Sequence, residues 1–191
     1  SFIKNAKTYR LSPDKIKQRL TEETWSRKQI AFVIIANSIY EEYEQTLHEK
    51  ELIDFEDMIN LASKIVSKET DLYKDVYDHI LIDEYQDISN QRYELINALM
   101  KKNDGCKLFC VGDDWQSIMG FAGSDPEFFI HFERYFPYPA VTYLTYNYRS
   151  TSSIVNTGNT IISYNKKYQI DKQVEAVNNQ THPIKVYASL H

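Results

Sequence analysis

The sequence has no apolar run that approaches the ~20 residues of a membrane span, and its start, SFIKNAKTYR, lacks the apolar core of a signal peptide. We therefore expect neither membrane association nor secretion. Cysteine is also scarce. Cys106 and Cys110 flank a short apolar segment, with no histidine or further cysteine nearby to complete a metal site. This usage predicts reduced, partly buried thiols in a cytoplasmic protein.

A basic excess is missing as well, since 22 Lys and Arg against 27 Asp and Glu give a formal net charge of −5. A free-standing nucleic-acid binder usually carries a basic excess. Any DNA contact must therefore come from local features or from parts that this sequence does not contain. None of the five glycines is followed by lysine, so the sequence has no G-x-x-x-x-G-K-[ST] phosphate-binding loop. The 42% of hydrophobic residues still suffices for a packed core.

The first seventy or so residues have a helical pattern. Pro13, after Ser12, is typical of a helix start. A second helix is expected from about Trp25, and a third from Phe55 to about Ser67. The second has an apolar residue at every fourth position: Ile35, Ile39, Tyr43 and Leu47. The inward side chains expected on the third are Met58, Ile59, Ala62, Ile65 and Val66.

The rest of the sequence alternates between short apolar segments and helical ones, which predicts an α/β domain with a parallel sheet. The run that ends in Asp83 is typical of a buried parallel strand whose carboxyl end opens onto a site. The expected strands are 79–83, 107–111, 140–145 and 184–188. The expected helices are one capped by Ser89 and ended by Gly105, one that starts at Asp125-Pro126 and runs to about Tyr135, and one capped by Ser150 or Thr151 that runs to about Tyr164.

Adjacent acids follow the first of these strands. In that position Asp83 can hold Mg²⁺ through its water shell, and Glu84 can orient and deprotonate a water that attacks a γ-phosphate. An acidic junction between strand and loop is also common without any catalytic role. The sequence of this segment alone leaves both readings open.

Polar residues follow two further strands. Gln116 lies after Val111-Gly112 and could sense a phosphate by a hydrogen bond, or could belong to an ordinary loop before a helix. Arg149 lies where a strand runs into a helix. It could reach a developing phosphate charge, and the neighbouring Tyr148 could stack on a base. Arg149 could equally be a surface arginine before a helix cap.

Taken together, these segments resemble the UvrD/Rep-like superfamily 1 DNA helicases, and most closely their helicase IV branch. The resemblance covers about residues 30–165 with very specific motifs and is weaker at both ends. It implies a partial RecA-like (P-loop NTPase) parallel sheet with flanking helices, and an N-terminal helical segment. The motifs are Ile53–Ile59 (IDFEDMI), Ile82–Asp87 (IDEYQD), Val111–Ile118 (VGDDWQSI), Phe121–Asp125 (FAGSD) and Tyr146–Ser150 (YNYRS).

The resemblance implies an enzyme that uses ATP and Mg²⁺ to move along single-stranded DNA, in the 3′ to 5′ direction, and to unwind duplex DNA. It makes Asp83 the Mg²⁺ ligand and Glu84 the base that activates water. Gln116 would couple the γ-phosphate to the DNA-binding side, and Arg149 would reach the transition state from the second RecA-like domain. Tyr148 would stack on the adenine.

Phe121 occupies the position where the family commonly has an aromatic side chain that stacks on a base of single-stranded DNA. A plain core phenylalanine is the other interpretation. The surrounding loop departs from the family. Many members have a Tyr-Arg pair at Met119-Gly120 and an arginine at Ala122. Without those cationic groups, phosphate and base contacts at this loop should be weaker.

The missing phosphate loop lies upstream in the family, and later motifs lie downstream, which predicts an internal piece of a longer protein. Its expected parts are a helical segment of an inserted subdomain (1–52), the C-terminal half of the first RecA-like domain (53–145) and the beginning of the second (146–191). Such a piece should not hydrolyse ATP alone. Two other hypotheses remain: a helicase-like ATP-binding factor that remodels a protein complex such as RNA polymerase, and a non-catalytic adaptor.

Overall fold

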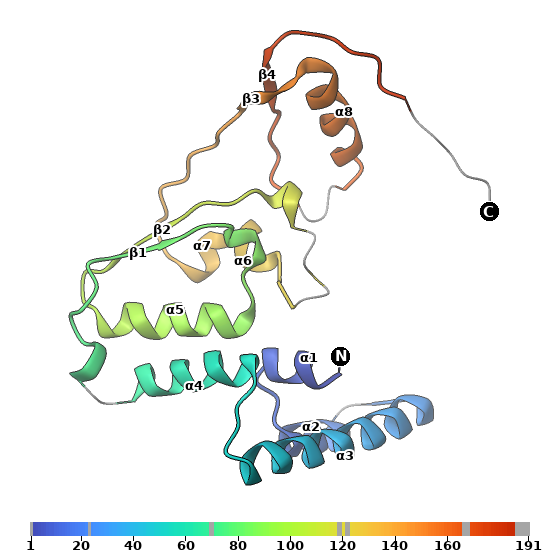
Figure 1. The fold of residues 1–191 in the computed structure, drawn as a ribbon, viewed down its shortest axis with the longest axis vertical. Coiled ribbons are helices and arrows are strands. Elements are labelled where there is room, and N and C mark those ends of the chain that lie inside the picture. The colour runs from blue at the N-terminus through green and yellow to red at the C-terminus, as the bar shows by residue number, and fades with distance from the viewer. Residues whose placement is uncertain are drawn as a thin grey trace. The chain divides into compact units, whose positions relative to one another are not determined.

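The chain forms two compact units, one from residues 1–112 and 119–125 and the other from 113–118 and 126–191 (Figure 1). The structure, a computed structural model, describes residues 2–22, 24–68, 71–117, 120, 123–165 and 169–185. Each unit combines helices with a pair of parallel strands, which confirms the predicted α/β class. Within these described ranges, no helix is long and apolar enough to cross a bilayer.

The first unit begins with four α-helices and continues into a strand, helix, strand arrangement. Its elements are α1 (Phe2–Thr8), α2 (Pro13–Glu22), α3 (Arg27–Glu49), α4 (Phe55–Ser67), η1 (Asp71–Tyr73), β1 (His79–Ile82), η2 (Tyr85–Asp87), α5 (Asn90–Lys102) and β2 (Lys107–Cys110). The predicted starts of α2 and α4 are confirmed. At α3, Ser26 and Gln29 form a capping box, which supplies acceptors for backbone N–H groups of the first turn.

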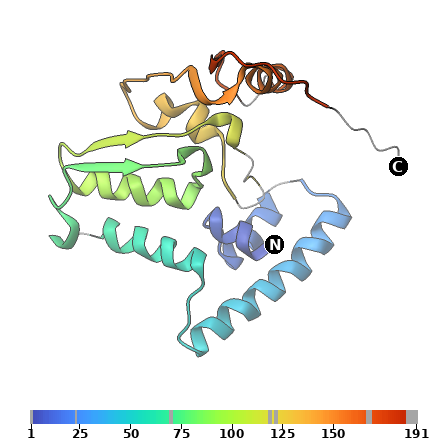
Figure 2. The same ribbon diagram turned by 45° about the horizontal axis from the view of Figure 1, so that its top comes forward.

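Strands β1 and β2 pair in parallel, with His79 opposite Lys107 and Ile82 opposite Cys110. Helix α5 runs alongside them, and α4 packs against α5 (Figures 1 and 2). Burial alternates along both strands. The predicted buried strand is therefore buried on one face only: Leu81 on the other face is 72% exposed. Parallel sheets are normally covered on both faces, and within the described part of this unit only one face is covered.

Both cysteines are free and half-buried, as predicted. Cys110 lies on the covered face of β2. Burial raises the pKa of its thiol to about 12, because the thiolate would lose its hydration there. The Cys110 thiol is thus protonated, and weakly nucleophilic, at neutral pH.

The apolar stripe predicted on α3 matches its packed face only in part, since Tyr43 packs against the core cluster around Tyr40. Ile35 and Ile39 are exposed, whereas Asn37 and Tyr40 are buried. The reason is geometric. A spacing of four residues advances ~400° around a helix of ~3.6 residues per turn, so such a stripe drifts by ~40° at each step. The side of α3 that packs against the core carries Val33 and Tyr40, whose separation is close to two full helical turns.

Helix α5 ends earlier than predicted, at Lys102 rather than near Gly105. Asn103 occupies the C-cap position of α5. Its side-chain Nδ2 donates to the carbonyl of Leu99 (2.7 Å), and its Oδ1 accepts from the backbone N–H groups of Val76 (2.6 Å) and Tyr77 (2.8 Å). Ser89 stands at the N-cap position, as predicted, but makes no side-chain capping hydrogen bond. Asn103 thereby ties the end of α5 to the segment that enters β1.

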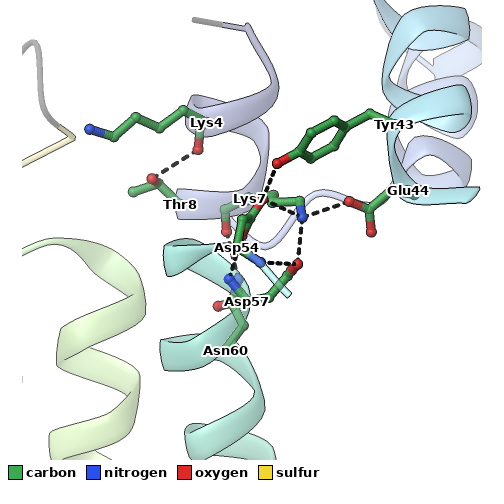
Figure 3. A network of polar contacts seen from close by, with 8 residues as sticks. All are labelled: Lys4, Lys7, Thr8, Tyr43, Glu44, Asp54, Asp57 and Asn60. Carbon is green, nitrogen blue, oxygen red and sulfur yellow. Dashed lines mark hydrogen bonds and ion pairs between the residues drawn. The ribbon is translucent and has the colours of Figure 1, made fainter. Parts of the chain in front are cut away.

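A buried lysine joins three helices of this unit (Figure 3). Lys7 Nζ, at the end of α1, lies 2.6 Å from Glu44 Oε1, 2.7 Å from Asp54 Oδ2 and 2.7 Å from Asp57 Oδ2. Its side chain is 2% exposed, and its ammonium also lies 5.1 Å from the centroid of the Tyr43 ring. Burial by itself would lower the pKa of Lys7, but the hydrogen bonds to the three carboxylates outweigh it and raise that pKa. The lysine is therefore charged.

The Lys7 network also explains why the inward face predicted for α4 is partly wrong. Met58 and Ile65 are exposed, and the buried residues are Ser63 and Val66. Asn60 Nδ2 donates to the carbonyl of Lys7 (3.0 Å). A polar side of α4 is thus turned towards α1, because α1 offers a cation and a carbonyl as partners.

The second unit is built around β3 and β4. Its elements are η3 (Asp114–Gln116), α6 (Glu127–Ile130), α7 (Phe132–Tyr135), β3 (Tyr146–Thr151), α8 (Ser152–Ile162) and β4 (Glu175–Asn178). Two short helices replace the single one predicted up to Tyr135, because the backbone leaves the helical region at His131. Phe128 and Phe136 are buried and anchor this segment.

The predicted strand 140–145 is wrong, since the strand is β3 and begins at Tyr146. A strand needs a partner, and β3 finds one in β4, which the sequence analysis did not predict. Helix α8 packs on both strands. Asn159 Nδ2 also donates to the carbonyl of Val174 (2.8 Å), just before β4. Of the strand predicted at 184–188, Ile184 and Lys185 have no regular structure, and the remainder lies outside the described residues.

Candidate functional site

The two adjacent acids lie in the turn that follows β1, as predicted. Asp83 Oδ1 accepts a hydrogen bond from the backbone N–H of Glu84 (2.9 Å). Glu84 has φ 51° and ψ 42°, in the left-handed region, which residues other than glycine rarely adopt. Both side chains are exposed. Backbone conformations of this kind cluster at functional sites, where the surrounding structure holds them in place.

Buried neighbours hold this turn. Tyr85 is 1% and Gln86 is 2% exposed. The backbone N–H of Tyr85 donates to the carbonyl of Val111 (2.9 Å), which ties the turn to the end of β2. Gln86 Nε2 donates to Glu84 Oε2 (2.6 Å). The backbone after Glu84 is thus anchored to the end of β2, and the Glu84 carboxylate has a fixed hydrogen-bond donor in Gln86.

The last acid of the same motif lies apart from this pair. Asp87 lines a cavity of about 220 Å³ together with Ser89 and Ser124. Within the described residues, Asp87 Oδ1 and the two serine hydroxyls are buried without a hydrogen-bond partner. Such polar cavities suit ordered water, which can both donate and accept. The Ile82–Asp87 motif therefore supplies side chains to two separate places, the exposed acidic pair and this cavity.

The acidic pair fits a magnesium ion held mainly by water and phosphate. Among the described residues, no group of three or more His, Cys, Asp or Glu side chains is placed to cage a metal. Mg²⁺ typically keeps several waters and takes one or two carboxylates together with phosphate oxygens. Asp83 has one oxygen bonded to the backbone of Glu84 and an exposed carboxylate. It can therefore serve as such a ligand.

Gln116 ends η3 in the second unit, and its side chain turns back to Asp113. Gln116 Nε2 donates to Asp113 Oδ2 (2.9 Å), and Asp113 Oδ1 accepts from the backbone N–H of Trp115 (3.2 Å). Burial would raise the pKa of the Asp113 carboxyl, but the hydrogen bonds from Gln116 and Lys172 outweigh it and lower that pKa. The carboxylate is therefore ionised and orients the Gln116 amide.

Lys172 is a residue of this cluster that the sequence analysis missed. Its Nζ lies 2.9 Å from Asp113 Oδ1 and 2.6 Å from Asp114 Oδ1. The second oxygen of Asp114 accepts from the backbone N–H of Ile170 (2.6 Å). No spacing rule links a lone lysine to acids 58 and 59 positions earlier, so only the fold reveals the contact.

Tyr148 and Arg149 lie within β3, at an irregularity in its pairing with β4. Asn147 Oδ1 accepts from the backbone N–H groups of Arg149 (3.0 Å) and Ser150 (2.7 Å). A side chain that captures two backbone donors takes them from the ladder, and such bulges re-aim neighbouring side chains. Tyr148 is 78% exposed, and Arg149 is also exposed. Both can therefore meet a ligand.

The predicted site residues fall into three described groups. Asp83 and Glu84 adjoin in the first unit; Gln116 lies with Asp113 in the second, and Tyr148 with Arg149 in β3. Their convergence on one nucleotide stays a prediction. The predicted DNA contact Phe121 lies outside the described residues.

Comparison with known proteins agrees with this set of motifs. Residues 1–137 match the UvrD/REP helicase N-terminal domain. The chain is 38% identical over 131 residues to YjcD of Bacillus subtilis (strain 168), covering 67% of this chain and 17% of YjcD. It is 34% identical over 134 residues to the ATP-dependent DNA helicase PcrA of Staphylococcus epidermidis, covering 68% and 18%.

A third relative is the ATP-dependent DNA helicase Rep of Buchnera aphidicola, 32% identical over 133 residues, which cover 68% of this chain and 20% of Rep. The chain thus matches about a fifth of the length of these curated relatives. The narrower likeness to the helicase IV branch stays a prediction. A family match over 137 of 191 residues, which takes in the acidic turn after β1, is sufficient for the assignment: the chain belongs to the UvrD/Rep helicase family.

Proposed function

We propose that this chain is an internal part of an ATP-dependent DNA helicase and supplies the water-activating side of its ATPase site. The observation that carries the proposal is the braced acidic turn, in which Asp83 and Glu84 are exposed at the carboxyl end of a parallel strand. Ligands of open α/β sheets bind at that edge. The two relatives Rep and PcrA are named as ATP-dependent DNA helicases.

In this proposal the acidic pair divides two tasks. Asp83 would hold a hydrated Mg²⁺, which supplies charge neutralisation on the β- and γ-phosphates. Glu84 would accept a proton from the attacking water. Its hydrogen bond from Gln86 Nε2, at 2.6 Å, orients the carboxylate for that step. A general base in such a position typically contributes ~10²- to 10⁴-fold in rate.

The second unit would contribute the remaining contacts to the nucleotide. Arg149 would neutralise charge that develops on the transferred phosphoryl group, and Tyr148 would stack on the adenine. Their exposure on the irregular part of β3 leaves both side chains accessible. Gln116 would hydrogen-bond the γ-phosphate and relay its presence to the DNA-binding side of the domain.

The DNA contact assigned to this chain is Phe121, as a stacking platform for a base of single-stranded DNA. Stacking of this kind is worth about 1–3 kcal/mol per base and tolerates any sequence. It suits a motor that moves along single-stranded DNA, with 3′ to 5′ polarity, and unwinds the duplex ahead. We also propose that the protein is located in the cytoplasm.

The proposed division of the chain is a helical segment of an inserted subdomain (1–52), the C-terminal half of a first RecA-like domain (53–145) and the start of a second (146–191). The phosphate-binding loop would come from a part of the helicase upstream of this chain. Because that loop holds the β- and γ-phosphates, we expect no measurable ATP hydrolysis from the isolated chain.

Glu84→Gln in the helicase that carries this chain tests the proposal. ATP binding should persist, because the amide keeps the size of the carboxyl group, whereas hydrolysis and unwinding should fall ~10²-fold or more. Glu42→Gln, at an exposed position of α3, is the matched control and should hydrolyse ATP at the wild-type rate. Normal hydrolysis by Glu84→Gln would refute the assignment of the base.

A further inference from the structure

We propose that Lys172 is a positioning residue that keeps Gln116 oriented for its contact with the γ-phosphate. The inference rests on the proposed ATPase function and extends it to a residue outside the motifs. It starts from one shared carboxylate: Asp113 binds Lys172 through Oδ1 (2.9 Å) and Gln116 through Oδ2 (2.9 Å). Lys172 therefore acts on Gln116 through a single intermediate group.

The ammonium of Lys172 is held in place on several sides. It donates to Asp114 Oδ1 (2.6 Å) as well as to Asp113, and it lies 5.2 Å from the centroid of the Trp115 ring. The Lys172 side chain is 15% and the Asp114 side chain 1% exposed. Ion pairs of this buried kind are little screened by solvent, so the contact is not a loose surface pair.

Charge repulsion explains why the lysine is needed. Asp113 and Asp114 are consecutive, and both carboxylates lie on the same ammonium. Without a cation between them, two adjacent carboxylates at low hydration repel, and Asp113, which is 38% exposed against 1% for Asp114, is the one with room to turn outward. That movement would release Gln116 Nε2 from Asp113. The orientation of the amide would then no longer be fixed.

Lys172 itself comes from the segment between α8 and β4, far along the chain from Gln116. That segment is anchored nearby, because Ile170 donates its backbone N–H to Asp114 Oδ2 (2.6 Å). The same cluster thus links the loop after β2 to the segment before β4. A substitution at either end of this cluster should therefore alter the orientation of Gln116 without removing a contact to the nucleotide.

Four variants of the full helicase, three single and one double, test this inference by steady-state ATP hydrolysis. Lys172→Met should lower kcat ~10- to 100-fold with KM for ATP nearly unchanged, as expected for a misplaced rather than a missing contact. Gln116→Ala should have a similar effect, and the double variant should be no slower than Gln116→Ala alone. Lys172→Arg, which keeps the charge, should recover most of kcat.

Lys185→Met is the matched control, because Lys185 is exposed in the same unit and loses the same charge. It should retain wild-type kcat. Emission from Trp115 gives a readout independent of catalysis. In the 191-residue chain with Trp25→Phe, Trp115 is the remaining tryptophan, and Lys172→Met should shift its emission whereas Lys172→Arg should not.

The outcomes separate the two proposals. If the wild-type helicase hydrolyses ATP but Lys172→Met matches it in kcat, or if the effects of Lys172→Met and Gln116→Ala multiply, the role of Lys172 is refuted while the ATPase assignment stands. If the wild-type full helicase does not hydrolyse ATP, the proposed function fails, and this inference fails with it. Lower kcat that Lys172→Arg restores, with unchanged KM, supports the inference.

Discussion

Lys7 Nζ, at the end of α1, lies 2.7 Å from Asp54 Oδ2 at the N-cap of α4, 47 positions later in the chain. The same ammonium also contacts Glu44 of α3 and Asp57 of α4. One buried cation thus holds together segments that are far apart in sequence (Figure 3).

Lys7→Met should strongly destabilise the chain. The substitution keeps the bulk of the side chain but leaves three carboxylates close together without a cation. Breaking a buried ion pair in this way typically costs about 3–5 kcal/mol. The measurement is the free energy of unfolding from urea titration followed by circular dichroism.

Lys17→Met is the matched control for that loss. Lys17 also pairs with a glutamate of α3, Glu41, but at the surface, where ion pairs contribute little. Its free energy of unfolding should stay close to the wild-type value. Equal losses in the two variants would contradict the structural role assigned to Lys7.

The pH dependence of stability should report the same network. Burial would raise the pKa of Asp54, but hydrogen bonds from Lys7, the backbone of Asp57 and Tyr43 outweigh it and lower that pKa. A carboxyl whose pKa is lower when folded stabilises the fold above its unfolded value, ~4, and the contribution disappears as pH falls through the folded pKa.

The difference in unfolding free energy between wild type and Lys7→Met should therefore be largest at neutral pH and shrink as pH falls below about 4. Urea titrations at pH 7, 4 and 3 measure it. A difference that stays constant over this range would mean that the lysine does not stabilise the ionised form of Asp54.

Asn147→Ala should slow ATP hydrolysis by the full helicase. Asn147 Oδ1 accepts two backbone N–H groups, those of Arg149 and Ser150. Each such hydrogen bond contributes about 1 kcal/mol to stability, and their loss frees the backbone that carries the arginine. We expect a lower kcat and a small drop in thermal stability. Asn156→Ala, exposed on α8, should change neither.

The sequence predicted what depends on local pattern. The apolar runs at β1 and β2 and the motif turns lie where expected, because strand ends and the acids that follow them are close in sequence. The faces of α3 and α4 were predicted less well. A buried lysine attracts the polar side of α4, and a stripe with a spacing of four residues follows the packed side of α3 only at Tyr43, not at Ile35 and Ile39.

The remaining differences come from partners that are distant in sequence. β3 forms where β4 pairs with it, not along the alternating segment before Tyr146. Lys172 joins the Asp113 cluster across 59 positions, which no periodicity indicates. The bulge at Asn147 depends on a side chain that captures two backbone donors, so the irregular placement of Tyr148 and Arg149 could be seen only in the structure.

The proposed function requires Arg149 to act on the same phosphate as the acidic pair. The most direct test compares the dissociation constants of ADP and of ADP with aluminium fluoride, both with Mg²⁺, in the wild-type helicase and in Arg149→Ala. Aluminium fluoride mimics the transferred phosphoryl group, and transition-state analogues bind far more tightly than ground-state ligands. We predict that Arg149→Ala loses about 10³-fold of affinity for the analogue, while its affinity for ADP changes little. Equal affinity for the analogue in wild type and variant would contradict the account.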